Sequence, residues 1–213
     1  MIDLCFSVLG ARPDPQAATP TLVFRVRIQA TMPVHAMLLH CQLQIEPRRR
    51  HHVHAEQERV FDLFGEPSRW SDTLRPLTWT RSSLTVPAFD ESVDIELAVA
   101  CTYDFDVAAA KYLHALEGGE LPLRFLFSGT VFAKAENGFR VAQVPWDKEA
   151  LYRMPVAAWR EVMEAHFPGS AWIRLRRESL NRLQLFRAQR GLLNWDEAIE
   201  ALMGESREEA AVQ

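Results

Sequence analysis

Most of the first 145 residues fall into short segments in which apolar side chains alternate with charged or polar ones. The clearest segment places Phe24, Val26 and Ile28 at every second position, with Arg25 and Arg27 between them. Successive side chains of a strand point to opposite faces, so this pattern is typical of a half-buried antiparallel strand. Seven segments bounded by turn-forming residues are expected to be strands: 3–9, 21–30, 36–46, 77–86, 93–102, 122–134 and 138–145.

The number and spacing of these strands favour one antiparallel β-sandwich. Seven strands without parallel crossover helices indicate an immunoglobulin-like sandwich within an α+β fold, rather than a doubly wound sheet. We expect residues 1–145 to form this domain, with Asp94 and Glu96 on a solvent-facing side. The side chains expected to point inward are Phe24, Val26, Ile28, Leu97, Phe125 and Phe127.

Two short helices are expected between the strands. Residues 56–64 end at Gly65, a residue type that commonly follows the last helical turn. Residues 106–116 follow Asp104 and Asp106. These aspartates are a candidate acid–base pair or calcium ligand set, but a carboxylate just before a helix more often caps it and offsets its positive end. We interpret them as caps.

The hydrophobic period changes after Trp146, from alternate positions to helical spacing. Pro155 is expected to open a helix in which Val156, Trp159 and Met163 share one face.

Further along, residues 171–190 are expected to form the longest helix. Asn194 should cap a last short helix, with Glu197 at the capping-box position. Segment 146–203 is therefore expected to be helical and packed on the sandwich, whereas 204–213 is polar and expected to be a disordered tail.

Composition limits the class of protein. Of 213 residues, 48% are hydrophobic and 24% charged, which suffices for one sizeable core. The net charge of -4 gives no overall attraction to nucleic acid or anionic lipid. The three widely spaced cysteines indicate no disulfide framework, and the first residues lack the pattern of a secretion signal. The longest uncharged stretch, 28–45, contains Pro and His, so we expect no membrane span and a cytoplasmic location.

No short motif identifies a catalytic site. The sequence lacks a phosphate-binding P-loop, a dinucleotide-binding glycine fingerprint, a nucleophile elbow and a metalloprotease helix. Their absence removes the enzyme classes that short motifs can reveal. We therefore expect a non-catalytic protein without a cofactor. The alternative is an enzyme with a dispersed site in a groove between sandwich and helices.

The densest polar cluster runs from Arg48 to His54. If this segment were extended, His52 and His54 would lie on one face, where two imidazoles can bind one metal ion such as zinc or nickel. Cys41 is a further candidate ligand. The alternative is a solvated loop after Pro47, because no co-ligand lies at a defined spacing from the histidines. A protein that handles a metal or metallocluster is thus a second hypothesis.

Residues 171–190 place apolar and basic side chains on the same side of the expected helix. The apolar arc contains Trp172, Leu175, Leu180, Leu183 and Phe186, and three arginines intrude on it, Arg176, Arg187 and Arg190. In one interpretation their guanidinium groups pair with sandwich carboxylates, for which Asp94 and Glu96 are candidates. In the other, Trp172 and the three arginines bind a protein partner, because aromatic residues and Arg are enriched in interface hot spots.

Several unbroken strings resemble an uncharacterised bacterial protein family whose members have about the length of this chain. The strings are LFGEP at 63–67, RW at 69–70, CTYDF at 101–105, KYL at 111–113, LFSGTVF at 126–132, VPW at 144–146, FP at 167–168 and AW at 171–172. None is a motif with known chemistry. The resemblance implies genes located beside those of [NiFe] hydrogenases, and hence an assembly or maturation accessory. Our first hypothesis is a non-catalytic protein-binding accessory whose partner is a hydrogenase component or maturation factor.

Overall fold

A computed structural model of the chain describes residues 2–102, 104, 107–135, 138–171 and 173–211, and the side chains of these residues except 135 and 205–211. The chain divides into two compact units, Met1–Ala171 and Trp172–Gln213. Each unit is described by itself below. None of the helices in the described ranges is long and apolar enough to cross a membrane.

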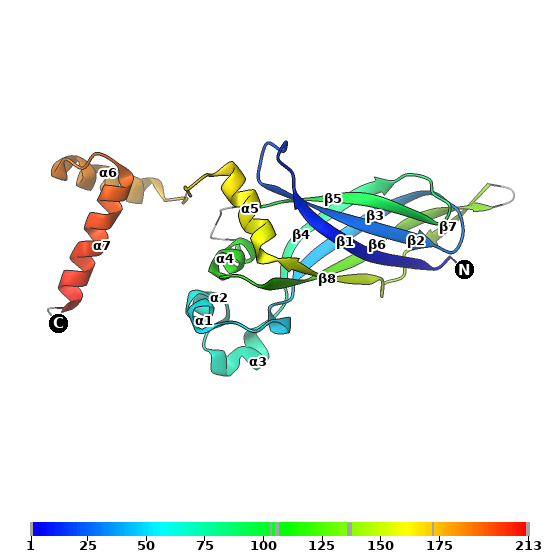
Figure 1. Cartoon of the computed structure of the whole chain (residues 1–213), viewed down its shortest axis with the longest axis horizontal. Helices are drawn as coiled ribbons and strands as arrows, with labels where there is room; N and C mark the ends of the chain where they lie inside the picture. The colour runs from blue at the N-terminus through cyan, green and yellow to red at the C-terminus, as the bar shows by residue number, and fades with distance from the viewer. Residues whose placement is uncertain (1, 103, 105–106, 136–137, 172, 212–213) are drawn as a thin grey trace. The chain divides into compact units, whose positions relative to one another are not determined.

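The first unit contains two antiparallel β-sheets (Figure 1). One sheet has the order β1-β2-β5, formed by Leu4–Pro13, Thr21–Ala30 and Ser92–Ala100. The other has the order β4-β3-β6-β7, formed by Leu77–Val86, Val34–Ile45, Glu120–Ala135 and Gly138–Gln143, and β8, Glu149–Pro155, also pairs with β6. The predicted sandwich within an α+β fold is confirmed, and all seven predicted strands are present.

The eighth strand shares one edge of β6 with β7. Gln143 of β7 lies opposite Thr130, and Glu149 of β8 lies opposite Leu126. The five residues 144–148 therefore bulge out opposite only three residues of β6. Two hydrogen bonds anchor the bulge, from Val144 N to Gly129 O and from Phe127 N to Lys148 O. The side chain of Trp146 within the bulge is 93% exposed.

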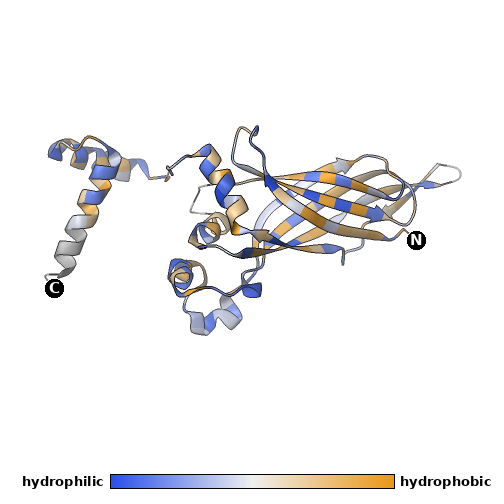
Figure 2. Ribbon diagram, in the orientation of Figure 1, coloured by the Kyte–Doolittle hydropathy of each residue, from blue (hydrophilic) through white to orange (hydrophobic). Residues whose placement is uncertain are grey.

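The core lies between the two sheets, as the alternation of hydrophilic and hydrophobic residues along the strands indicates (Figure 2). All six side chains predicted to point inward are buried. The Phe24 ring packs edge-on against Phe125, and the rings of Phe6 and Phe127 stack with centroids 4.2 Å apart. Such aromatic pairs between sheets contribute contact area and favourable ring geometry together.

The two acidic residues predicted to face outward do so, but their partners differ from those proposed. Asp94 binds the guanidinium group of Arg27 at 2.7 Å, and Glu96 binds Arg12 at 2.8 Å. The Arg27–Asp94 pair joins the neighbouring strands β2 and β5, whereas the Arg12–Glu96 pair reaches across β2 from β1 to β5. Each of these carboxylates thus has an arginine partner within the first unit.

Five helices of the first unit gather at one end of the sheets (Figure 1). The helix predicted at 56–64 is two short helices, α1 at His54–Arg59 and α2 at Phe61–Phe64, and α3 follows at Trp70–Thr73. The helix expected at 106–116 is α4, at Ala108–Ala115, and α5 follows β8 at Val156–His166. Two 3-10 turns span Pro47–Arg49 and Pro67–Arg69.

The predicted caps of α4 are not confirmed. The residue that precedes this helix is Val107, which makes no side-chain capping bond. Asp104 lies three residues earlier, where its carbonyl accepts a hydrogen bond from Val107 N. Asp106, the second predicted cap, lies outside the described residues.

The boundary between the units differs from the one predicted. The first unit runs to Ala171 rather than to residue 145, because β8 and α5 contribute to its core. Met154 of β8 and Trp159, Val162 and Met163 of α5 are buried, and α5 packs against β1 and β2. The predicted helical segment 146–203 is therefore divided, and its first part belongs to the sandwich unit.

The second unit is a pair of helices, α6 at Arg177–Arg190 and α7 at Trp195–Ala211. The prediction that 171–190 is the longest helix was wrong: α6 has 14 residues and α7 has 17. Arg176 has an extended backbone and precedes the first turn of α6. Because α7 continues to Ala211, it includes most of the segment that was expected to be a disordered tail.

Local sequence signals define the turn between α6 and α7. Gly191 follows α6 with φ 65°, a left-handed conformation that costs glycine little. Gly191 N donates to Ala188 O, and Leu192 N donates to Arg187 O, which together form a Schellman motif. The predicted cap is confirmed, because Glu197 N donates to Asn194 Oδ1 at 2.8 Å. The Glu197 carboxylate accepts hydrogen bonds from Asn194 Nδ2 and from Leu193 N, which is a variant of the predicted capping box.

Candidate functional site

A buried ion pair joins the loop after β3 to helix α1. Arg50 Nη2 donates to both carboxylate oxygens of Glu56, at 2.7 and 2.9 Å, and only 9% and 1% of the two side chains is exposed. Glu56 also accepts a hydrogen bond from Glu117 N at 2.8 Å, and Arg50 Nη2 donates to Gly118 O at 3.3 Å. The pair thus links the Arg48–His54 cluster to the loop between α4 and β6.

His52 lies beside this pair, and only 3% of it is exposed. Its Nε2 atom and the hydroxyl of Tyr112 are hydrogen-bonded at 2.8 Å, and Trp70 packs edge-on against the imidazole with centroids 5.1 Å apart. Burial, and then the positive charge of Arg50, lower the pKa of His52 from 6.5 to about 4. Burial raises the pKa of Tyr112 above its ordinary value. Both groups are therefore neutral near pH 7.

Because the folded protein disfavours a charged His52, acid should destabilise it through this residue. In the unfolded chain His52 has a pKa of 6.5, and in the folded chain its pKa is about 4. The unfolded chain therefore takes up the proton first, and stability is lost as pH falls from 6.5 toward 4. We expect His52 to account for about 2 to 3 kcal/mol of the loss in unfolding free energy between pH 7.5 and 4.5.

Urea denaturation at both pH values tests this expectation, with His52→Asn as the comparison because asparagine does not titrate. The fall in unfolding free energy should be smaller in the variant by that amount. Equal falls in the two proteins would contradict the assignment of a depressed pKa to His52.

The predicted metal ligands are not brought together. His52 is buried against Tyr112, whereas His54 begins α1 and lies in solvent, 3.6 Å from Glu58. Cys41 is buried in β3, where burial raises the pKa of its thiol to about 12 and so disfavours the thiolate that a metal requires. Within the described ranges no group of three or more His, Cys, Asp or Glu side chains is arranged to hold a metal ion.

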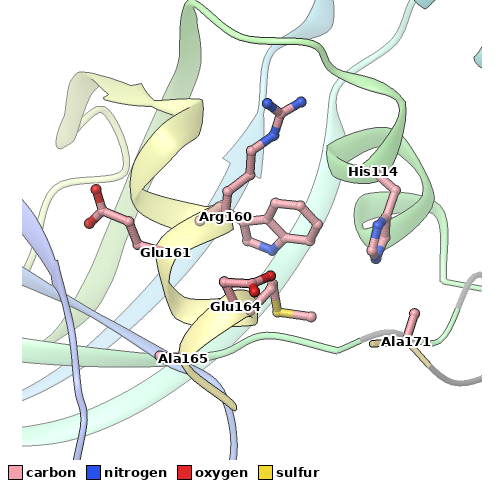
Figure 3. Close-up of a pocket in the computed structure, with 8 residues that line it drawn as sticks. His114, Arg160, Glu161, Glu164, Ala165 and Ala171 are labelled. Atoms are coloured by element: carbon pink, nitrogen blue, oxygen red, sulfur yellow. The ribbon is translucent and has the colours of Figure 1, made fainter. Parts of the chain in front are cut away.

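A groove of about 790 Å³ lies between α4 and α5 (Figure 3). Trp159 lines it and is only 4% exposed, and the Trp159 Nε1–H group has no acceptor within the described part of the chain. The imidazole of His114 packs edge-on against the indole at 4.7 Å, and burial lowers the pKa of His114. Glu164, which lies on α5 with Trp159, accepts a hydrogen bond from Gly169 N. The groove thus offers a buried donor to a ligand that carries a hydrogen-bond acceptor.

The predicted partner-binding residues lie in the second unit. The guanidinium carbon of Arg187 is 4.1 Å from the centre of the Trp195 ring, and that of Arg190 is 4.5 Å from the Phe186 ring. The contact between Arg187 and Trp195 depends on the turn that returns α7 toward α6, whereas Phe186 and Arg190 lie one turn apart within α6. Neither contact was predicted. Arg176 precedes α6, and Trp172 lies outside the described residues.

The second unit buries little of its apolar surface. Within the described ranges Ala198 is its only buried residue, whereas Leu185 is 62% exposed, Leu193 86% and Met203 54%. A groove of about 490 Å³ in this unit is lined by residues of α6, including Arg182, Leu185 and Phe186, and by Leu202 of α7. Sequence analysis identified the basic and apolar character of α6, but it did not identify this groove.

Charge is divided unequally between the two helices of the second unit. Helix α6 contains four arginines and one glutamate. The first ten residues of α7 contain Asp196, Glu197 and Glu200 and no basic residue. The surface therefore has a basic side on α6 and an acidic side on the first turns of α7.

Solved structures offer only weak similarity to the chain. β-Glucosidase 3B from Thermotoga neapolitana, in complex with glucose, is 13% identical with a TM-score of 0.30, and the match covers 71% of this chain and 17% of that one. A β-glucosidase from Kluyveromyces marxianus is 8% identical with a TM-score of 0.26, covering 72% and 15%. Similarity at this level carries no argument about fold or activity. No curated protein matches the chain.

A protein-family model matches residues 1–211, and so includes both the sandwich unit and the α6–α7 unit. The match bears out the expected membership of an uncharacterised family. The chain belongs to DUF6084, a family of unknown function.

Proposed function

We propose that the chain is a non-catalytic accessory protein that binds a protein partner through the α6–α7 unit. The observation that carries this proposal is the exposure of most large apolar residues of that unit, from 36% at Trp195 to 86% at Leu193. A soluble protein rarely leaves a contiguous apolar surface in water, and such surfaces commonly mark interaction sites. Two short helices alone also bury too little surface to be stable without further packing.

The charge distribution indicates the chemistry of the partner. Arg182 of α6 lines the groove that contains Leu185 and Phe186, and α6 carries three further arginines. A complementary surface would insert an apolar side chain into this groove and place carboxylates opposite Arg176, Arg187 and Arg190. Stacking on Trp195 and Phe186 would hold Arg187 and Arg190 in place before binding, which reduces the entropy lost on association.

The resemblance described above supports a hydrogenase component or a maturation factor as this partner. An accessory of that kind requires no catalytic site of its own. It requires a surface that recognises an unassembled subunit, and the α6–α7 unit offers an apolar groove with a basic border for that purpose.

Replacing Leu185 with aspartate should abolish binding without unfolding the protein. The side chain lies in the groove and is 62% exposed, so the substitution removes little buried area from the chain itself. We expect capture of hydrogenase subunits or maturation factors from the native cell to fall at least about tenfold. The melting temperature should change by less than about 2 °C.

The matched control is Leu151→Asp, which introduces the same charge at a 52% exposed leucine of β8 in the first unit. Its capture should equal that of the wild type. The proposal fails if Leu185→Asp captures the same partners as the wild type. It also fails if Leu185→Asp lowers the melting temperature strongly, because the groove would then be covered by the chain itself.

A further inference from the structure

A smaller pocket, of about 340 Å³, opens beside the buried Arg50–Glu56 pair in the first unit. Its lining includes Arg48, His51 and His52 from the polar cluster, together with Trp70 and Ser71 from α3. None of the described residues that line it is acidic. The protein as a whole carries a net charge of -4, so this concentration of basic and hydrogen-bonding groups is a local feature.

The charge of this pocket comes mainly from Arg48. Arg50 is neutralised by Glu56 at 2.7 Å, but within the described side chains no carboxylate lies at ion-pair distance from Arg48. An arginine at the mouth of a pocket can donate two parallel hydrogen bonds to one phosphate or carboxylate.

The inner part of the pocket supplies neutral polar groups. When the Tyr112 hydroxyl donates to His52 Nε2, the neutral imidazole carries its proton on Nδ1 and can donate from that atom. Ser71 adds a hydroxyl, and the Trp70 ring forms an apolar wall. Only 3% of His52 is exposed to solvent, so a hydrogen bond from His52 to a ligand would be stronger than the same bond in water.

We propose that this pocket binds a small anion through a phosphate or carboxylate group. Arg48 provides the charge, His52 and Ser71 provide hydrogen bonds, and Trp70 can pack against an organic part of the ligand. The pocket lies within the sandwich unit, so this inference does not depend on the partner surface of α6 and α7. The failure of either proposal would leave the other intact.

NMR titration of the full chain tests the inference. The probes are inorganic phosphate and phenyl phosphate, each added at an ionic strength held constant with chloride. The signal followed is the indole N–H of Trp70, which donates to Gly65 O at 3.0 Å and can be assigned with Trp70→Phe. We expect saturable shifts of this signal. Tighter binding of phenyl phosphate would indicate an organic ligand, and equal binding would indicate free phosphate.

Arg48→Glu should weaken phosphate binding by about tenfold or more, because it removes a charge-assisted contact and adds repulsion. Arg48→Lys should retain part of the affinity. The matched control is Arg140→Glu on β7, at the other end of the sheets (Figure 1), which should bind like the wild type. The inference is overturned if Trp70 does not shift with either probe, or if Arg48→Glu binds phosphate as tightly as Arg140→Glu.

Discussion

Replacing Glu56 with glutamine is expected to lower the free energy of unfolding by about 3 to 5 kcal/mol, because it leaves the guanidinium group of Arg50 buried without a counter-charge. Only 9% of the Arg50 side chain is exposed, so water cannot take the place of the carboxylate. The substitution also weakens the acceptor for Glu117 N, which positions the loop after α4. Urea denaturation followed by fluorescence or circular dichroism measures the loss.

Two further variants separate the causes. Asp94→Asn removes an exposed ion pair, with Arg27, and should lower the free energy of unfolding far less than Glu56→Gln does. The double variant Arg50→Met with Glu56→Leu removes both charges and should recover much of the stability lost by Glu56→Gln. A loss below about 1 kcal/mol for Glu56→Gln would show that the pair does not hold this region together.

The sandwich could be predicted because its strands have one buried face. Alternation at Phe24, Val26 and Ile28 specifies both the period and the inward direction, and these residues are buried. The same signal exists in β8, where Ala150 and Met154 are buried at even spacing. It was missed because Pro145 and Trp146 form a bulge between two strands, and their residue types also suit a domain boundary.

The organisation around His52 could not be predicted, because it depends on contacts between residues far apart in the sequence. The spacing of His52 and His54 places them on one face only if the chain is extended, but α1 begins at His54. His52 is hydrogen-bonded to Tyr112, which is 60 residues away in the sequence. Glu56 accepts a hydrogen bond from Glu117 N, which is 61 residues away. A glutamate in the first turn of a short helix gave no local sign of a buried ion pair.

In the second unit, prediction from the sequence was better for the turn than for the helix lengths. Gly191, Asn194 and Glu197 act through bonds to nearby residues, so their roles can be recognised locally. The start of α6 lacks a comparable signal, because Arg176 makes no side-chain capping bond. Helix ends without a capping residue are set by packing, which a sequence pattern does not specify.

Replacing Gly129 with alanine is expected to cost more than about 3 kcal/mol, or to prevent folding, for two physical reasons. Gly129 has φ 143°, a conformation that residues with a Cβ rarely adopt. A Cβ at this position would lie 2.0 Å from the backbone oxygen of Leu38. This oxygen belongs to β3, which pairs with β6 in the middle of its sheet, so it cannot move away without breaking the ladder.

Two other glycines provide matched comparisons for this substitution. Gly138→Ala introduces a side chain at φ 121° into open space, so it carries the backbone strain without the clash. Gly10→Ala has open space and no positive φ, and should change stability by less than about 1 kcal/mol. Unfolding free energies should therefore decrease in the order Gly10→Ala, Gly138→Ala, Gly129→Ala. A Gly129→Ala protein as stable as Gly10→Ala would show that β3 and β6 do not approach each other this closely at Gly129.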